Sequence, residues 1–215
     1  MIRSASVILI SIIALCSIVA AQGGAGVQKP AEKVSVSYGL VVDNSGSFRT
    51  LLDKVIAVVS DVVEENTAED EAFLVTFVDT PKIVLRQEFT NRKSDLHDSA
   101  QNMFIEGGQT AILDAVKSSA DYLAKNAKTD PGRMRALVLV TDGEDRASGS
   151  KIEDVVKVLK EQNIRVFVIA MAETKVFTKV IDRLTKETGG IVVTSRTRAD
   201  LGAAAKQISV AMRTR

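Results

Sequence analysis

The sequence predicts an α/β protein with a doubly wound, mostly parallel central sheet, one antiparallel edge strand and helices on both faces. Three observations predict this fold. Apolar runs of strand length alternate with segments in which apolar residues recur at helical spacing. Several of the runs are apolar almost throughout, as strands are when both of their faces are buried. Strand and helix follow each other in the order that gives crossovers between parallel strands.

The first half of the chain is expected to contain three strands. The first strand covers 34–43 and leads into a helix over about 47–65, where apolar residues recur every three or four positions. A second strand covers 72–79. The segment 82–89 alternates between apolar and polar residues, which indicates an antiparallel edge strand joined to the second strand by a hairpin. The polar segment 90–106 leaves room for a short helix.

After a Gly-rich break at 107–109, helices and strands continue to alternate. In order, we expect a helix over 110–125, a strand over 135–142, a helix around 152–159, a strand over 164–172, a helix over 175–187, a strand over 189–195 and a helix over 201–214. Ligands of such sheets bind at the carboxyl ends of the strands, near the point where strand order reverses. Asp43, Thr110 and Asp142 each lie where a strand or a Gly-rich turn passes into a helix, so we expect them to converge at this edge.

The first 21 residues read as a secretory signal. Arg3 provides a short basic start, and the apolar run over 7–21 is shorter than the roughly 20 residues that a helix needs to cross a bilayer. We therefore expect cleavage before Gln22, then a linker over 22–33 and one domain over 34–215. This predicts a secreted or periplasmic protein, with no membrane insertion after removal of the signal. An uncleaved N-terminal anchor is the alternative.

Composition disfavours several classes of function. The signal contains the only cysteine, so the remaining chain has no thiol for a nucleophile, a thiolate metal site or a disulfide. Loss of Arg3 reduces the 28 basic residues to the number of acidic ones, 27, and no basic stripe is interleaved with aromatics, so nucleic-acid binding is not expected. The single histidine, His97, lies in a polar stretch and is expected to be a solvated surface residue. The sequence leaves the oligomeric state open.

Oxygen-bearing side chains gather in three stretches. Asp43, Ser45 and Ser47 follow the first strand at alternate positions, Thr110 follows a Gly-rich turn, and Asp142 ends a buried strand. Hydroxyl and carboxylate oxygens without histidine or cysteine are typical ligands of a hard cation, Mg²⁺ in the first place, with Mn²⁺ and Ca²⁺ as alternatives.

The first of these stretches has two other interpretations. Ser and Asp are favoured helix N-caps, although a cap needs only one of the three side chains. Asp43 beside Mg²⁺ would also suit an aspartyl-phosphate hydrolase. Such enzymes generally place a second acid where this chain has Ser45, and the sequence offers no general acid or base for the reaction. A serine nucleophile is also disfavoured, because the motif is not Gly-x-Ser-x-Gly.

Taken together, Asp-x-Ser-x-Ser, Gly-Gly-x-Thr and Thr-Asp-Gly resemble the motifs of the von Willebrand factor type A domain family, over about residues 34–212. Secreted bacterial members are the most similar. The resemblance implies a metal-ion-dependent adhesion site at Asp43, Ser45, Ser47, Thr110 and Asp142. It also implies that the two serines bind the metal directly, the threonine directly or through water, and the two aspartates largely through bridging water.

In this interpretation an Asp or Glu side chain of a protein partner fills an open metal position. No bond is made or broken, so the protein is not expected to be an enzyme. A structural or assembly module of the bacterial envelope with an idle metal site is the alternative, and a Mg²⁺-dependent hydrolase with Asp43 as nucleophile is less favoured. One departure from the family pattern is Gln109, inserted between Gly-Gly and Thr110, which puts the conformation of that loop in question.

Overall fold

The computed structural model of the protein describes residues 34–195 and 197–214. The expected signal over 1–21 and the expected linker over 22–33 lie outside the described residues. Within the described ranges, no helix is long and apolar enough to cross a bilayer.

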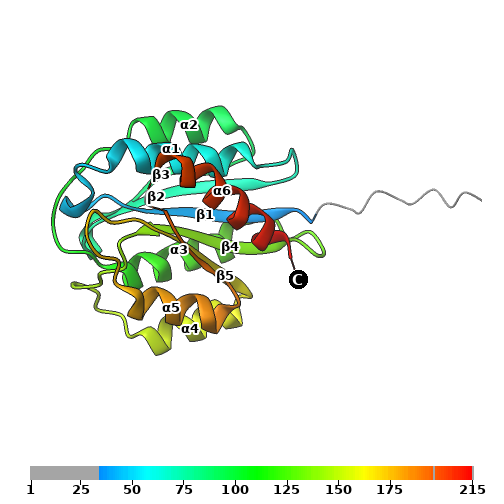
Figure 1. Ribbon diagram of the computed structural model, residues 1–215. Coiled ribbons are helices and arrows are strands. Elements are labelled where there is room, and N and C mark those ends of the chain that lie inside the picture. The colour runs from blue at the N-terminus through cyan, green and yellow to red at the C-terminus, as the bar shows by residue number, and fades with distance from the viewer. Residues whose placement is uncertain (1–33, 196, 215) are drawn as a thin grey trace, which may run out of the picture. The chain divides into compact units, whose positions relative to one another are not determined.

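A six-stranded sheet lies at the centre of the fold, with the strand order β3-β2-β1-β4-β5-β6 (Figure 1). Its strands are β1 (Val36–Asp43), β2 (Glu71–Phe77), β3 (Ile83–Thr90), β4 (Met134–Thr141), β5 (Ile164–Ala170) and β6 (Val192–Thr194). Neighbouring strands pair in parallel except β2 and β3, which are antiparallel. The predicted fold class, a mostly parallel sheet with one antiparallel edge strand, is confirmed.

Helices cover both faces of the sheet (Figure 1). One face carries α1 (Leu52–Glu64), α2 (Lys93–Gln101) and α6 (Arg198–Arg213), and the other carries α3 (Ile112–Asn126), α4 (Ile152–Glu161) and α5 (Thr178–Thr188). Each layer of helices encloses its own apolar core against the sheet. These two cores account for the long apolar runs in the sequence, because a strand between them is buried on both sides.

The strand β1 shows this arrangement most clearly. All eight of its residues are buried, with Leu40 and Val42 in the core below α1 and α6 and Val41 in the core below α3. It pairs with β2 on one side and β4 on the other. The chain leaves β1 toward β2 and leaves β4 toward β5, in opposite directions. The carboxyl ends of β1 and β4 therefore form the point of strand-order reversal at which such sheets bind ligands.

Several boundaries differ from the sequence prediction, and three of the differences have a clear cause in the structure. The first long helix begins at Leu52 rather than near 47, because a short 3-10 helix, η1 (Gly46–Phe48), comes first. The helix expected from 175 begins at Thr178, since the preceding loop is bonded to the end of β4. The last strand is limited to Val192–Thr194, because Gly189 adopts a left-handed conformation that closes α5.

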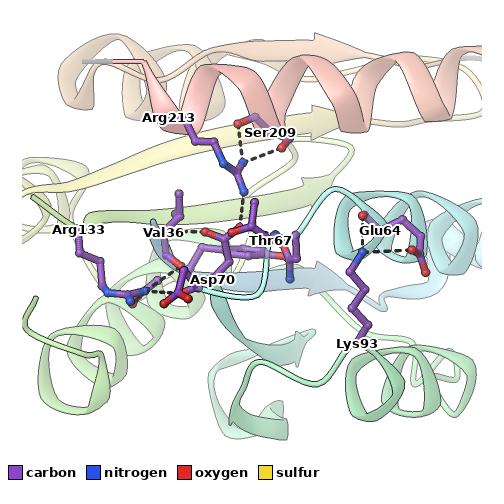
Figure 2. Close-up of polar contacts among 12 residues, drawn as sticks. Val36, Glu64, Thr67, Asp70, Lys93, Arg133, Ser209 and Arg213 are labelled. Atoms are coloured by element: carbon purple, nitrogen blue, oxygen red, sulfur yellow. Dashed lines mark hydrogen bonds and ion pairs between the residues drawn. The ribbon is translucent and has the colours of Figure 1, made fainter. Parts of the chain in front are cut away.

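The opposite edge of the sheet, at the amino end of β1, contains a buried ion pair between Asp70 and Arg213 (Figure 2). The Asp70 carboxylate also accepts hydrogen bonds from the backbone N–H groups of Val36, at 2.8 Å, and Thr67, at 2.7 Å. This one side chain therefore joins the last helix, the first strand and the turn between α1 and β2.

Candidate metal centre

The two aspartates of the predicted site lie at neighbouring strand ends. Asp43 is the last residue of β1, and Asp142 follows Thr141, the last residue of β4. The parallel register pairs Val42 with Val140, so Asp43 and Thr141 are neighbours across the sheet. The Thr141 hydroxyl donates to Asp43 Oδ2 at 2.9 Å. Thr141 therefore orients the first carboxylate, a role that the sequence analysis missed.

The loop from Asp43 to Ser47 turns tightly around the Asp43 carboxylate. The Ser45 backbone N–H donates to Asp43 Oδ1 at 3.0 Å, and the Ser45 and Ser47 hydroxyl oxygens are 3.1 Å apart. Residues two apart in an α-helix point about 200° away from each other, so the non-α-helical turn here is what allows the two hydroxyls to meet. Ser45 is buried and Ser47 is exposed.

The interpretation of these residues as helix caps is wrong. Ser45 occupies the N-cap position of η1 but makes no side-chain capping bond, and Leu51 occupies that position in α1. The serine side chains are therefore not used to begin a helix.

Asn44, between Asp43 and Ser45, anchors this loop to the segment that follows α2. Its carbonyl oxygen accepts from the Glu106 N–H and its Nδ2 donates to the Phe104 carbonyl oxygen, each at 3.1 Å. Only 2% of Asn44 is exposed, and its Oδ1 is buried without a hydrogen-bond partner in the described structure. Sequence reasoning missed Asn44 because its partners lie about sixty positions away.

Thr110 is buried and lies at the entrance to α3. Its carbonyl oxygen accepts from the N–H groups of Arg146, at 2.8 Å, and Ala147, at 3.0 Å, which belong to the loop after Asp142. Between the described residues, no hydrogen bond joins the Thr110 hydroxyl to the other four predicted ligands. The inserted Gln109 is exposed and follows two glycines with positive φ, so the extra residue is accommodated on the surface while Thr110 stays buried.

Gly143 makes the turn after Asp142. Its φ is +85°, and an added Cβ would lie 1.9 Å from the Phe177 carbonyl oxygen. The Phe177 N–H donates to the Asp142 carbonyl oxygen at 2.7 Å, and the Glu144 N–H donates to Asp142 Oδ1 at 3.0 Å. Glycine at this position therefore allows the 171–177 loop to pack directly against the second aspartate.

Burial raises the pKa of the Asp43 carboxyl from its ordinary 3.8 to about 7. Hydrogen bonds from Ser45 and Thr141 oppose this rise, and the nearby charge of Asp142 adds to it. No lysine, arginine or histidine forms an ion pair with either carboxylate in the described part of the chain. A bound divalent cation would oppose this rise and favour the ionised form of Asp43.

The composition of this edge of the sheet fits a hard cation. Two buried carboxylates and three hydroxyls come from three loops, and such oxygens are the donors that Mg²⁺ prefers. Over residues 34–195 and 197–214, no three Asp, Glu, His or Cys side chains gather as a metal-binding group. A cation here would therefore depend on hydroxyl oxygens as well as carboxylates.

The prediction that His97 is a solvated surface residue is wrong. His97 lies on α2 with 22% of its side chain exposed, and its Nε2 is 2.7 Å from Glu64 Oε1. It is a half-buried residue that binds a carboxylate of α1, not a solvated one.

Known proteins share this sequence pattern and this architecture. Residues 39–207 match the sequence model described as the von Willebrand factor type A domain. A comparison with curated proteins found no match. Among solved structures, BatB of Bacteroides thetaiotaomicron, described as a conserved hypothetical protein, is 18% identical with a TM-score of 0.67, covering 83% of this chain and 100% of that one.

Two further structures are similar. An aerotolerance-related membrane protein of Bacteroides fragilis, with multiple mutations to serine, is 19% identical with a TM-score of 0.67, covering 82% of this chain and 100% of the other. A von Willebrand factor type A protein of Catenulispora acidiphila is 14% identical with a TM-score of 0.69, covering 83% of this chain and 43% of the other. At these identities the likeness shows the fold.

Proposed function

Because this chain belongs to the von Willebrand factor type A domain family, we propose that it is a protein-interaction module that uses a bound divalent cation to hold a partner's acidic side chain. The observation that carries the proposal is the pair of buried carboxylates, Asp43 and Asp142, at the strand-order reversal, with hydroxyl groups beside them and no cationic side chain among the described residues paired to either. The cation is Mg²⁺, with Mn²⁺ or Ca²⁺ as alternatives.

The neutral hydroxyls and the charged carboxylates of the site are proposed to have different roles. Ser45 and Ser47 would bind the cation directly and Thr110 directly or through water, while Asp43 and Asp142 act from behind, largely through water. Neutral hydroxyls leave most of the positive charge uncompensated, so an open coordination position attracts an anion. An Asp or Glu of another protein is the simplest such anion.

An exposed phenylalanine close to the same loop supports the proposal that this part of the molecule binds another protein. Phe104 is 49% exposed although its backbone is bonded to Asn44, and the Arg86 guanidinium lies 4.9 Å from the centre of its ring. Arg86 is held in turn by Thr76 Oγ1 at 2.8 Å and Glu106 Oε1 at 3.3 Å. Aromatic and arginine side chains are enriched where proteins bind one another, and here an exposed Phe104 lies beside a partly exposed Arg86.

Catalysis by Asp43 is disfavoured by its surroundings. The carboxylate is 1% exposed, and its two oxygens accept hydrogen bonds from Ser45 and Thr141. A nucleophile must reach its substrate, whereas a buried carboxylate that orients metal-bound water need not. We therefore propose binding without a chemical step. We also propose that the protein is secreted or periplasmic, on the basis of the sequence of its first 21 residues.

The test is thermal unfolding of the domain in Mg²⁺ and in chelator. At about 100 times the dissociation constant, Mg²⁺ would stabilise the folded state by about 2.7 kcal/mol, a rise in Tm of roughly 5–10 °C for a domain of this size. Asp43→Ala is expected to abolish the rise. Asp182→Ala, an exposed acid on α5, removes the same charge and should retain it. A wild-type Tm that is equal in both conditions, at high Mg²⁺ concentration, would refute the metal site.

A further inference from the structure

The loop after Asp142 caps the first turn of α3 with two of its side chains. Asp145 Oδ1 accepts from the Ile112 N–H at 2.9 Å, and Ser148 Oγ accepts from the Leu113 N–H at 3.0 Å. The Ser148 hydroxyl donates to Asp145 Oδ1 at 2.7 Å, so the two capping groups support each other.

The helix α3 has no cap of its own. Its N-cap residue is Ala111, whose methyl group cannot accept a hydrogen bond. The amides of a first helical turn need acceptors, and here these acceptors come from residues more than thirty positions further along the chain. The start of α3 is therefore fixed only when the two segments come together.

A reciprocal set of bonds strengthens this junction. The Asp114 carboxylate, in the first turn of α3, accepts from the N–H groups of Gly149 at 2.9 Å and Ser150 at 2.8 Å. The Thr110 carbonyl oxygen accepts from two backbone amides of the same loop, as described above. Bonds of both directions thus hold one short loop against the start of one helix.

Resting on the proposed function, we propose that Asp145 and Ser148 are positioning residues of the metal centre: they set Thr110 at a fixed place relative to Asp142. These two predicted ligands belong to different segments of the chain. Thr110 follows a stretch with two glycines of positive φ and an exposed Gln109. The N–H of the next residue, Ala111, donates to the Val78 carbonyl oxygen at 2.7 Å, which ties this segment to the residue after β2 but not to the loop of Asp142. The Asp145 and Ser148 side chains, which together form a clamp on the start of α3, couple Thr110 to the loop that carries Asp142.

The expected effect on the metal follows from this coupling. Removing an outer partner of a metal ligand typically lowers metal affinity by about 10- to 100-fold. The Asp145 side chain is bonded to the Ile112 N–H and not to Thr110 itself, and the backbone bonds to Thr110 remain when it is truncated. We therefore expect Asp145→Ala to weaken Mg²⁺ binding by about tenfold, at the lower end of that range.

Three variants distinguish the positioning effect of the Asp145 side chain from the effect of its charge on Mg²⁺ binding. Asp145→Ala removes the acceptor and the charge. Asp145→Asn removes the charge and keeps an oxygen for the Ile112 amide, and should stay within about threefold of wild-type affinity. Glu144→Gln removes a neighbouring charge whose side chain binds Arg146 at 2.7 Å and makes no hydrogen bond to α3 among the described residues, and it should also stay within about threefold.

Mg²⁺ affinity is measured by titration calorimetry, and capping by amide hydrogen exchange of Ile112 and Leu113 in chelator. Support is a tenfold loss of affinity and faster exchange of Ile112 in Asp145→Ala alone. Unchanged affinity in Asp145→Ala, or an equal loss in Asp145→Asn or Glu144→Gln, overturns the positioning role. If Asp145→Ala does not fold, Ser148→Ala takes its place, with the faster exchange expected at Leu113 and unchanged affinity again overturning the proposal. A wild-type protein that binds no Mg²⁺ overturns the proposed function itself.

Discussion

The ion pair between Asp70 and Arg213 allows a quantitative test of how the last helix is held. Asp70 is 0% exposed and the Arg213 side chain 13% exposed. Arg213→Met keeps an apolar side chain of similar length for packing and removes the guanidinium. The Asp70 carboxylate then stays buried with the N–H of Val36, at 2.8 Å, and the N–H and hydroxyl of Thr67, at 2.7 and 2.9 Å.

The magnitude follows from what remains. Removing one partner of a buried ion pair typically costs about 3–5 kcal/mol, because the other charge is left uncompensated. Three donors still stabilise the Asp70 carboxylate, and Arg213 Nε is buried without a partner in the described structure, so its removal recovers part of the cost. We therefore expect Arg213→Met to lower the free energy of unfolding by about 2–3 kcal/mol, and Tm by roughly 5–10 °C.

Urea unfolding of wild type, Arg213→Met, Asp70→Asn and the double variant gives the coupling energy of the pair. We expect at least about 1.5 kcal/mol for a pair this deeply buried. Arg183→Met is the matched control, because Arg183 pairs with Glu153 at 2.8 Å on the exposed surface and should change the midpoint little. A coupling energy below about 0.5 kcal/mol would refute the reasoning that burial makes this pair strong.

Two other predictions concern the neighbourhood of the candidate site. Gly143→Ala places a Cβ 1.9 Å from the Phe177 carbonyl oxygen at a positive φ and should cost on the order of 3 kcal/mol or more in urea unfolding. Gly107→Ala, where φ is also positive but nothing lies within 4 Å, should cost only about 1 kcal/mol, and an equal loss in both would contradict the steric argument. Burial acts to raise the pKa of the Asp114 carboxyl, but hydrogen bonds from Ser150 and its other donors outweigh it and hold the pKa at about 2. This carboxylate therefore adds stability above its unfolded pKa of 3.8, and that stability is lost as the pH falls toward 2. The free energy of unfolding measured between pH 2 and 5 should depend less on pH in Asp114→Asn than in wild type.

Much of the architecture was predictable because it depends on local periodicity. The runs that became β1, β2, β4 and β5 are largely apolar, because these strands are buried on both faces over most of their length. The alternation over 82–89 correctly marked β3 as the antiparallel edge strand, in which no residue is fully buried. The positions of Asp43 and Asp142 at strand ends followed from the same patterns.

The sequence failed where a contact between distant segments decides the local structure. The start of α1 was misplaced because Asp43, Ser45 and Phe48 form a turn around a carboxylate instead of a helical turn. Asn44 carried no signal, and Thr141 stood only as the first residue of the Thr-Asp-Gly motif, since the role of each depends on a partner far along the chain. The cap of α3 was also invisible, because its acceptors lie in the loop after β4.

By itself the sequence determined the fold class, the order of its elements and the oxygen-bearing residues at the ends of its strands, because burial patterns and residue chemistry are properties of short stretches. Only the tertiary structure decided which groups fix those residues and their loops in place. The Thr141 hydroxyl binds the Asp43 carboxylate, Asn44 binds the 104–106 segment, and the clamp of Asp145 and Ser148 caps the start of α3. The physical reason is that a hydrogen bond between residues thirty to one hundred positions apart exists only after the sheet has brought its strand ends together.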